Sequence, residues 1–331
     1  MTRAAGWLPE GIEEWLPPAS WRVERLRRDL LDRYRARGYE LVLTPLLEHL
    51  DALLSGAGSD LEQQTFKLVD PASGRLLGLR ADMTPQVSRI AAQRYPGEKV
   101  VRLCYLGTVL RTRPDSPGGS RSPRQVGCEL FGEAGIEGDI EVLQLMLETL
   151  LRAGVRDAHL DLGHVGIYRA IAGALGLAPQ DEAALFGILQ RKSAPDLREF
   201  AHQQELGAAA ARTLAELMDL NGGVAVLKKA RKRLGARTAA IGGALDTLEQ
   251  TVQRLHKLFP KLPMHVDLAE LRGYRYQTGM VYAAFAPGSG RELARGGRYD
   301  GGREFGKPRP ATGFSADLNE LLRLGQDKHS S

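Results

Sequence analysis

Cysteine is scarce in this chain of 331 residues, which contains Cys104 and Cys128 and no others. Two cysteines give no disulfide framework and too few ligands for a structural zinc site. The N-terminal segment carries Glu10, Glu13 and Glu14 where a signal peptide would be apolar. The sequence also lacks an apolar run long enough to span a membrane. We therefore expect a reduced, cytoplasmic protein with no membrane association.

The sequence motifs of common enzyme sites are absent as well. There is no phosphate loop of the G-x-x-x-x-G-K-[ST] type, no G-x-G-x-x-G after a strand, no H-E-x-x-H and no G-x-S-x-G elbow. The seven histidines are scattered, and His164 is expected to cap a helix or to pack. Residues 312–313 lack the paired acids of a phosphoribosyl-diphosphate loop. The residues by themselves predict no catalytic site, no metal site and no cofactor.

Charge is nearly balanced, with 45 basic and 40 acidic residues and a formal net charge of +5. This small excess permits an acidic partner without requiring one. The densest basic run is 228–233, and no aromatic residues interleave it. We interpret it as a solvated helix face, so nucleic-acid binding is not expected.

Helical and strand-like patterns come in separate runs, which is typical of an α+β fold. Apolar residues at helical spacing predict helices at 20–37, with Ser20 as N-cap and Gly38 as the stop, and at 139–153. Strand-like runs are expected, among others, at 39–43, 76–80, 264–268 and 280–285, and a hairpin is expected at 100–131. Residues 178–258, rich in Ala, Leu and charged residues, predict a helical insertion. The expected segments are therefore 1–177, 178–260 and 261–331.

The most informative region is a predicted hairpin formed by 105–111 and 124–132 around a Pro/Gly/Ser-rich loop. Alternation places Gln125 and Glu129 on one face of the second strand, with Arg111 across the hairpin. An amide, a carboxylate and a guanidinium suit a small zwitterionic ligand. The alternative is a half-solvated strand with ordinary polar residues.

The hairpin resembles motif 2 of the class II aminoacyl-tRNA synthetases of the histidyl type. Residues 43–48 resemble motif 1, the dimer element, and 79–85 resemble the amino-acid-binding loop. Residues 271–279 resemble the histidine-specific motif, and 296–314 resemble the approach to motif 3. The resemblance implies a synthetase-like antiparallel sheet flanked by helices and a homodimer formed through the motif 1 region.

Three positions depart from the synthetase pattern at points that handle ATP. Arg113 stands where the synthetases carry a nucleotide-binding glutamate, and Pro123 stands where an aromatic residue stacks on adenine. Glu320 falls at the motif 3 arginine that holds the γ-phosphate, where a carboxylate would repel phosphate. The nucleotide chemistry is expected to be lost.

The amino-acid positions, by contrast, persist. The resemblance assigns histidine binding to the following residues: Asp82, Thr84, Arg111, Gln125, Glu129, Arg272 and Tyr276. Gln277 stands where the synthetases carry a second tyrosine. A kept amino-acid site without ATP handling resembles the family of ATP phosphoribosyltransferase regulatory subunits. This family implies a non-catalytic chain that activates a short catalytic subunit in a hetero-octamer with four copies of each. It would bind L-histidine for feedback inhibition at the first step of histidine biosynthesis.

Other interpretations of the same residues stay open. Asp82 and Thr84 could serve only to cap the helix that begins near Pro85. Arg111 and Arg272 could be surface charges. The whole chain could be a truncated, synthetase-like adenylating enzyme, or a binding module that senses uncharged tRNA.

Overall fold

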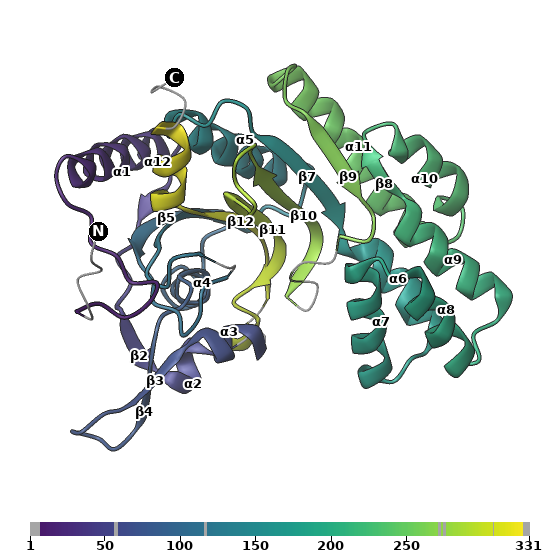
Figure 1. Cartoon of the computed structure of the whole chain (residues 1–331), viewed down its shortest axis with the longest axis horizontal. Helices are drawn as coiled ribbons and strands as arrows, with labels where there is room; N and C mark the ends of the chain where they lie inside the picture. The colour runs from purple at the N-terminus through teal and green to yellow at the C-terminus, as the bar shows by residue number, and fades with distance from the viewer. Residues whose placement is uncertain are drawn as a thin grey trace, which may run out of the picture. The chain divides into compact units, whose positions relative to one another are not determined.

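The computed structural model describes residues 7–55, 59–115, 118–270, 273, 276–306 and 308–326. The chain forms two compact units (Figure 1). The first consists of 1–156, 287–294 and 300–331, and the second of 157–286 and 295–299. The boundaries expected from the sequence, after 177 and after 260, follow the change in composition around residues 178–258, and that division stays a prediction.

The first unit is built on a sheet with strand order β1-β5-β6-β12. Its strands are β1 (Glu40–Leu41), β5 (Val101–Thr108), β6 (Arg124–Phe131) and β12 (Arg309–Asp317). β5 and β6 form the predicted antiparallel hairpin, and β12 continues the antiparallel pairing on the other edge of β6. β1 pairs with β5 in parallel, so the sheet is mixed rather than purely antiparallel as expected.

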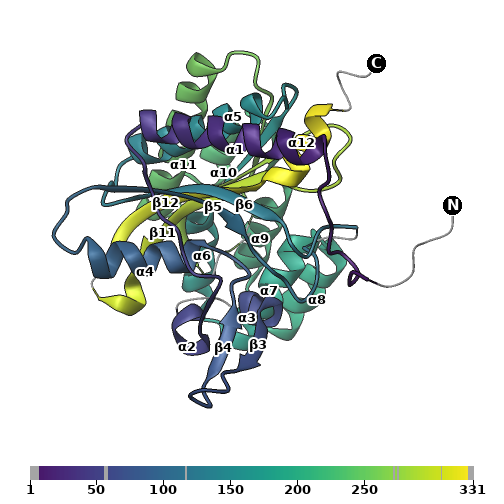
Figure 2. The same cartoon turned by 90° about the vertical axis from the view of Figure 1, so that its left-hand side faces the viewer.

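Helices cover both faces of this sheet (Figure 2). One face carries α1 (Ala19–Ala36), α5 (Ile136–Arg152) and α12 (Leu318–Gln326), and the other carries α4 (Thr84–Arg94). Near α4 lies the short helix η1 (Arg303–Phe305).

The predicted first helix is confirmed, and its periodicity explains its packing. Leu26, Leu30 and Tyr34 are buried on one side of α1, and the Tyr34 hydroxyl lies 2.8 Å from the Thr149 hydroxyl of α5. The helix is followed by Gly38 at φ +81°, a left-handed conformation that glycine adopts without strain. The expected N-cap is wrong, because α1 begins at Ala19 and no side chain caps it.

A smaller antiparallel sheet in this unit has the order β2-β4-β3. It consists of β2 (Leu47–His49), β3 (Phe66–Val69) and β4 (Leu76–Leu79), accompanied by α2 (Leu50–Leu53) and α3 (Ser59–Gln64). The strand expected at 39–43 is reduced to the two residues of β1.

The second unit has the strand order β11-β10-β7-β9-β8 and a set of packed helices. The strands are β7 (His159–His164), β8 (Asn221–Gly223), β9 (Met264–Asp267), β10 (Gln277–Phe285) and β11 (Ala294–Gly301). The helices are α6 (Val165–Leu175), α7 (Pro179–Arg191), α8 (Ala194–Gln203), α9 (Ala208–Asp219), α10 (Val226–Leu234) and α11 (Ala239–Leu258). The helical prediction for 178–258 is confirmed, apart from the short strand β8.

Two consecutive glycines, Gly296 and Gly297, lie within β11. A Cβ at Gly297 would lie 2.6 Å from the carbonyl oxygen of Met280 on β10. The close approach of this neighbouring strand therefore requires glycine. His164 behaves as expected, since its Nδ1 accepts the Gly166 N–H at the start of α6. Burial lowers the pKa of this imidazole to about 4.

The two thiols are buried, and burial raises the pKa of Cys104 to about 12 and that of Cys128 well above its ordinary value. Such thiols are poor nucleophiles. Within the described ranges, no helix combines the length and the apolar character needed to cross a membrane. The same ranges contain no group of three or more His, Cys, Asp or Glu side chains that could hold a metal ion.

Candidate functional site

A buried carboxylate lies at the centre of the first unit's sheet. Glu129 of β6 is 1% exposed, and its Oε1 accepts hydrogen bonds from the Thr84 hydroxyl at 3.1 Å and the Tyr105 hydroxyl at 3.2 Å. Gly313 pairs with Glu129 in the sheet, and a Cβ there would collide with the carboxylate. A half-solvated strand is therefore the wrong interpretation of β6.

Gln125 and Asp82 extend this polar cluster. The Gln125 amide oxygen accepts the Met83 N–H at 2.8 Å, and its Nε2 donates to Asp82 Oδ1 at 3.0 Å. Asp82 Oδ1 also accepts the N–H of Thr84, the first residue of α4, at 2.8 Å. Helix capping thus accounts for one contact of Asp82, and the contact with Gln125 ties the 81–84 loop to the hairpin.

Arg111 follows the hairpin's first strand and is only 8% exposed, so it is not a surface charge. Its Nε donates to the Ala81 carbonyl at 3.2 Å, and its Nη1 forms an ion pair with Asp115. The guanidinium is therefore anchored to the same loop that carries Asp82 and Thr84.

The structure brings four predicted residues into one hydrogen-bonded cluster and places Arg111 at the same loop. It adds Tyr105, which the sequence analysis missed. Strand parity could have found it, because Tyr105 pairs with Gly127 and so shares the face of Gln125 and Glu129. Burial and the Glu129 charge raise the pKa of the Tyr105 hydroxyl, which keeps it a donor.

Two further residues, Arg272 and Tyr276, were predicted to bind the ligand. Arg272 lies outside the described residues. Tyr276 belongs to the second unit, where its ring stacks on Tyr299 with centroids 4.7 Å apart. Their role in binding stays a prediction.

The three departures from the synthetase pattern have ordinary structural partners. Arg113 is exposed and donates to the Gln63 side chain at 2.8 Å, while the carbonyl of Pro123 accepts the Val109 N–H. Glu320 is 7% exposed, and its carboxylate lies 3.3 Å from Arg291 Nε. A buried acid paired in this way gives no cationic site for a phosphate.

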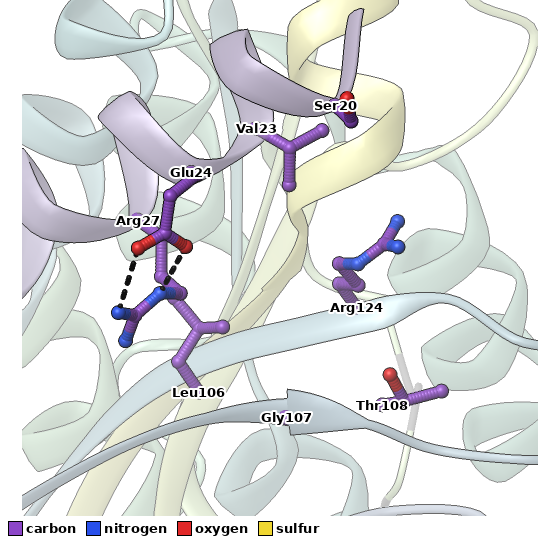
Figure 3. A pocket seen from close by; sticks show the side chains of 8 residues that line it. All are labelled: Ser20, Val23, Glu24, Arg27, Leu106, Gly107, Thr108 and Arg124. Carbon is purple, nitrogen blue, oxygen red and sulfur yellow. Dashed lines mark hydrogen bonds and ion pairs between the residues drawn. The ribbon is translucent and has the colours of Figure 1, made fainter. Parts of the chain in front are cut away.

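A cavity of about 340 Å³ lies on the α1 side of the hairpin (Figure 3). Ser20, Val23, Glu24 and Arg27 of α1 line it, together with Leu106, Gly107, Thr108 and Arg124 of the hairpin. Because neighbouring residues of a strand face opposite ways, Arg124 points to this side whereas Gln125 points to the polar cluster. The cavity is separate from the predicted ligand residues.

Comparison with known proteins places these observations in a family. The histidyl-tRNA synthetase family model matches residues 11–321. The ATP phosphoribosyltransferase regulatory subunit of Thioalkalivibrio sulfidiphilus is 53% identical over 326 residues, covering 98% of this chain and 82% of the relative. That of Methylococcus capsulatus is 55% identical over 318 residues, covering 96% and 78%. This chain belongs to the family of ATP phosphoribosyltransferase regulatory subunits.

A solved structure agrees with the assignment. The protein from Bacillus halodurans described as an ATP phosphoribosyltransferase regulatory subunit/histidyl-tRNA synthetase superposes with a TM-score of 0.86 at 27% identity. The match covers 98% of this chain and 85% of that one. The predicted class II synthetase-like α+β fold is confirmed.

Asp317, at the end of β12, gives a test of the electrostatics beside this site. Burial raises its pKa to about 6 from 3.8, with Glu320 adding to the effect and Arg111 opposing it. A carboxyl pKa raised in the folded state means that folding is most favoured below about pH 4, and that this advantage is lost as the pH rises through 6. Asp317→Asn removes the titration and keeps an oxygen for the Asn319 N–H that Asp317 now accepts.

We expect the free energy of unfolding of Asp317→Asn, relative to wild type, to increase by roughly 3 kcal/mol between pH 4 and pH 7. Urea denaturation across this pH range measures the difference. Asp219→Asn, at an exposed position of α9, is the control and should show no such trend. A pH-independent difference for Asp317→Asn would contradict the assignment.

Proposed function

We propose that this chain is a non-catalytic subunit that activates a short ATP phosphoribosyltransferase catalytic subunit and binds L-histidine for feedback inhibition. The single observation that carries the proposal is the polar cluster around Glu129, kept in a chain whose nucleotide positions are altered. The pairing with a catalytic subunit is supported by the description of relatives that are more than 50% identical to this chain. The hetero-octamer with four copies of each subunit is part of the same proposal.

The chemistry of the first unit suits the groups of free histidine. Asp82, Thr84 and Gln125 supply oxygen acceptors for the ammonium group, and Arg111 supplies a cation for the carboxylate. Glu129 supplies an acceptor for an imidazole N–H. The burial of Glu129 makes this recognition selective. A ligand with an apolar side chain in place of the imidazole would leave the buried carboxylate without the hydrogen bond from the imidazole N–H.

The absence of catalysis is supported by charge. Adenylation requires positive groups around the phosphates of ATP. At the motif 3 position this chain carries Glu320, whose carboxylate is buried between Arg291 and Arg323 at 3.3 and 3.5 Å. These arginines neutralise the acid, so they are not available to a phosphate.

Glu129→Gln tests the ligand site without changing the shape of the side chain. The amide oxygen can still accept from Thr84 and Tyr105, but it lacks the charge. A hydrogen bond to a charged group contributes about 1.5–3 kcal/mol, so the affinity for L-histidine should fall roughly tenfold or more. Isothermal titration calorimetry measures the affinity, with Glu137→Gln, at an exposed position of α5, as the control. Equal affinities would remove Glu129 from the site.

Mixing the chain with the short catalytic subunit of its own organism tests the regulatory role. We expect a larger complex in light scattering, a raised rate of ATP phosphoribosylation and inhibition of that rate by L-histidine. The uncomplexed chain is the control, and it should show no histidine-dependent exchange of pyrophosphate into ATP. Exchange activity would favour the adenylating enzyme, and a mixture without complex or rate change would exclude activation.

We also propose that the chain forms a homodimer through the motif 1 region, and an exposed apolar surface in this region supports the proposal. Leu41, Leu43, Leu46 and Leu47 are 45%, 81%, 48% and 40% exposed. Four exposed leucines in seven residues form the kind of patch that an interface covers.

We expect Leu43→Glu to shift the chain from dimer to monomer at micromolar concentration, because the charge would be buried in the interface. Light scattering gives the mass. Leu151→Glu, at a 47% exposed position of α5, is the matched control and should leave the dimer intact. A wild-type chain that is monomeric, or a Leu43→Glu chain that stays dimeric, would contradict the proposed interface.

A further inference from the structure

A segment before α1 crosses the tip of the hairpin that carries Arg111. Residues 9–15, here called the N-terminal clamp, begin with a turn in which the Ile12 N–H donates to the Pro9 carbonyl at 3.1 Å. The Arg121 N–H donates to the Gly11 carbonyl at 2.7 Å, and Arg121 Nη1 donates to the Glu10 carbonyl at 3.2 Å. Gly11 has φ +74°, and a Cβ there would lie 2.9 Å from Arg121 Cγ. The turn therefore fits against Arg121 only with glycine at this position.

Arg121 in turn makes two hydrogen bonds with the main chain of Arg111. Its Nε donates to the Arg111 carbonyl at 3.1 Å, and its own carbonyl accepts the Arg111 N–H at 2.8 Å. The guanidinium of Arg121 also lies over the Phe66 ring, 5.3 Å from the centroid. The main chain of Arg111 is thus held on both sides by one residue, which is itself held by the clamp.

Trp15 provides a second anchor. Two guanidinium groups lie over its ring, that of Arg124 at 5.9 Å and that of Arg323 at 5.5 Å from the ring centroid. Arg323 also forms an ion pair with Glu13 of the clamp. Arg124 is the first residue of β6, immediately before Gln125, and its Nη1 donates to Asn319 of α12 at 2.9 Å. The clamp therefore contacts the chain beside two predicted ligand residues, Arg111 and Gln125.

We propose that the N-terminal clamp, acting through Arg121, positions the Arg111 guanidinium for the carboxylate of the amino-acid ligand. This inference rests on the proposed histidine site and assigns Arg121 and residues 9–15 a positioning role in it. An arginine that is already ordered loses less conformational freedom when it binds a carboxylate. Loosening the clamp should therefore weaken binding even though the clamp supplies none of the predicted ligand contacts.

Two glycine substitutions form a matched pair for the test. Gly11→Ala and Gly74→Ala both place a side chain at positive φ, +74° and +70°, so both carry the same kind of backbone strain. A Cβ at Gly74 meets nothing within 4 Å, whereas a Cβ at Gly11 meets Arg121. We expect Gly11→Ala to weaken L-histidine binding by about three- to thirtyfold in calorimetry, and Gly74→Ala to leave it unchanged.

Hydrogen exchange of the intact chain gives a readout that needs no ligand. In Gly11→Ala the Arg111 and Arg121 amides should exchange faster than in Gly74→Ala, while the unfolding midpoints of the two variants stay similar. Trp15→Ala, which removes the second anchor, should act in the same direction on affinity.

The outcomes separate the two proposals. A wild-type chain that does not bind L-histidine would overturn the proposed histidine site. Hydrogen exchange of the Arg111 amide would then still show whether the N-terminal clamp orders Arg111. Faster exchange in Gly11→Ala with unchanged affinity would overturn the positioning role. Equal exchange in the two glycine variants would overturn the clamp itself.

Discussion

The burial of the Glu129 carboxylate is the constraint on which the first unit depends. A charge in the middle of a sheet costs several kcal/mol unless polar groups surround it. Two hydroxyl donors, those of Thr84 and Tyr105, meet it here. They come from different parts of the chain, so the start of α4 and the strand β5 must both be in place. The neighbouring strand β12 must in turn carry glycine at 313, because any side chain would occupy the position of the carboxylate.

Periodicity in the sequence predicted the helices and the hairpin, and strand alternation placed Gln125 and Glu129 on one face. These patterns could not show which contacts determine the conformation of the loops between the helices and strands. Arg80 illustrates the reason, since its buried guanidinium donates to the Thr44 carbonyl at 2.6 Å and the Thr108 carbonyl at 2.9 Å. One side chain thus joins three distant segments. The local pattern of residues does not reveal such long-range partners. For the same reason, the local pattern predicted a strand at 39–43 that is longer than the observed β1.

The roles proposed for the site residues come from family resemblance and not from local pattern. On local grounds, Asp82 was equally consistent with a helix cap, and in the structure it makes both the cap-like contact with Thr84 and the contact with Gln125. The charge of Glu320 could be read from the sequence, whereas its burial and its pairing with Arg291 and Arg323 are seen only in the structure. The acidic side chain at this position is thus neutralised within the chain, and the two arginines are already paired with it.

Arg111 is already ordered by partners within the chain. Its guanidinium already has an anionic partner, Asp115, in addition to the Ala81 carbonyl. In the proposed histidine site, a ligand carboxylate would compete with that ion pair. The net free energy of binding would then be the difference between two similar charge–charge interactions. The geometry of the contact then matters more than the charge itself, because both alternatives supply one negative group. A guanidinium that is ordered through Arg121 favours the anionic partner whose hydrogen-bond geometry fits it better. In this way the N-terminal clamp would affect ligand binding without contacting the ligand.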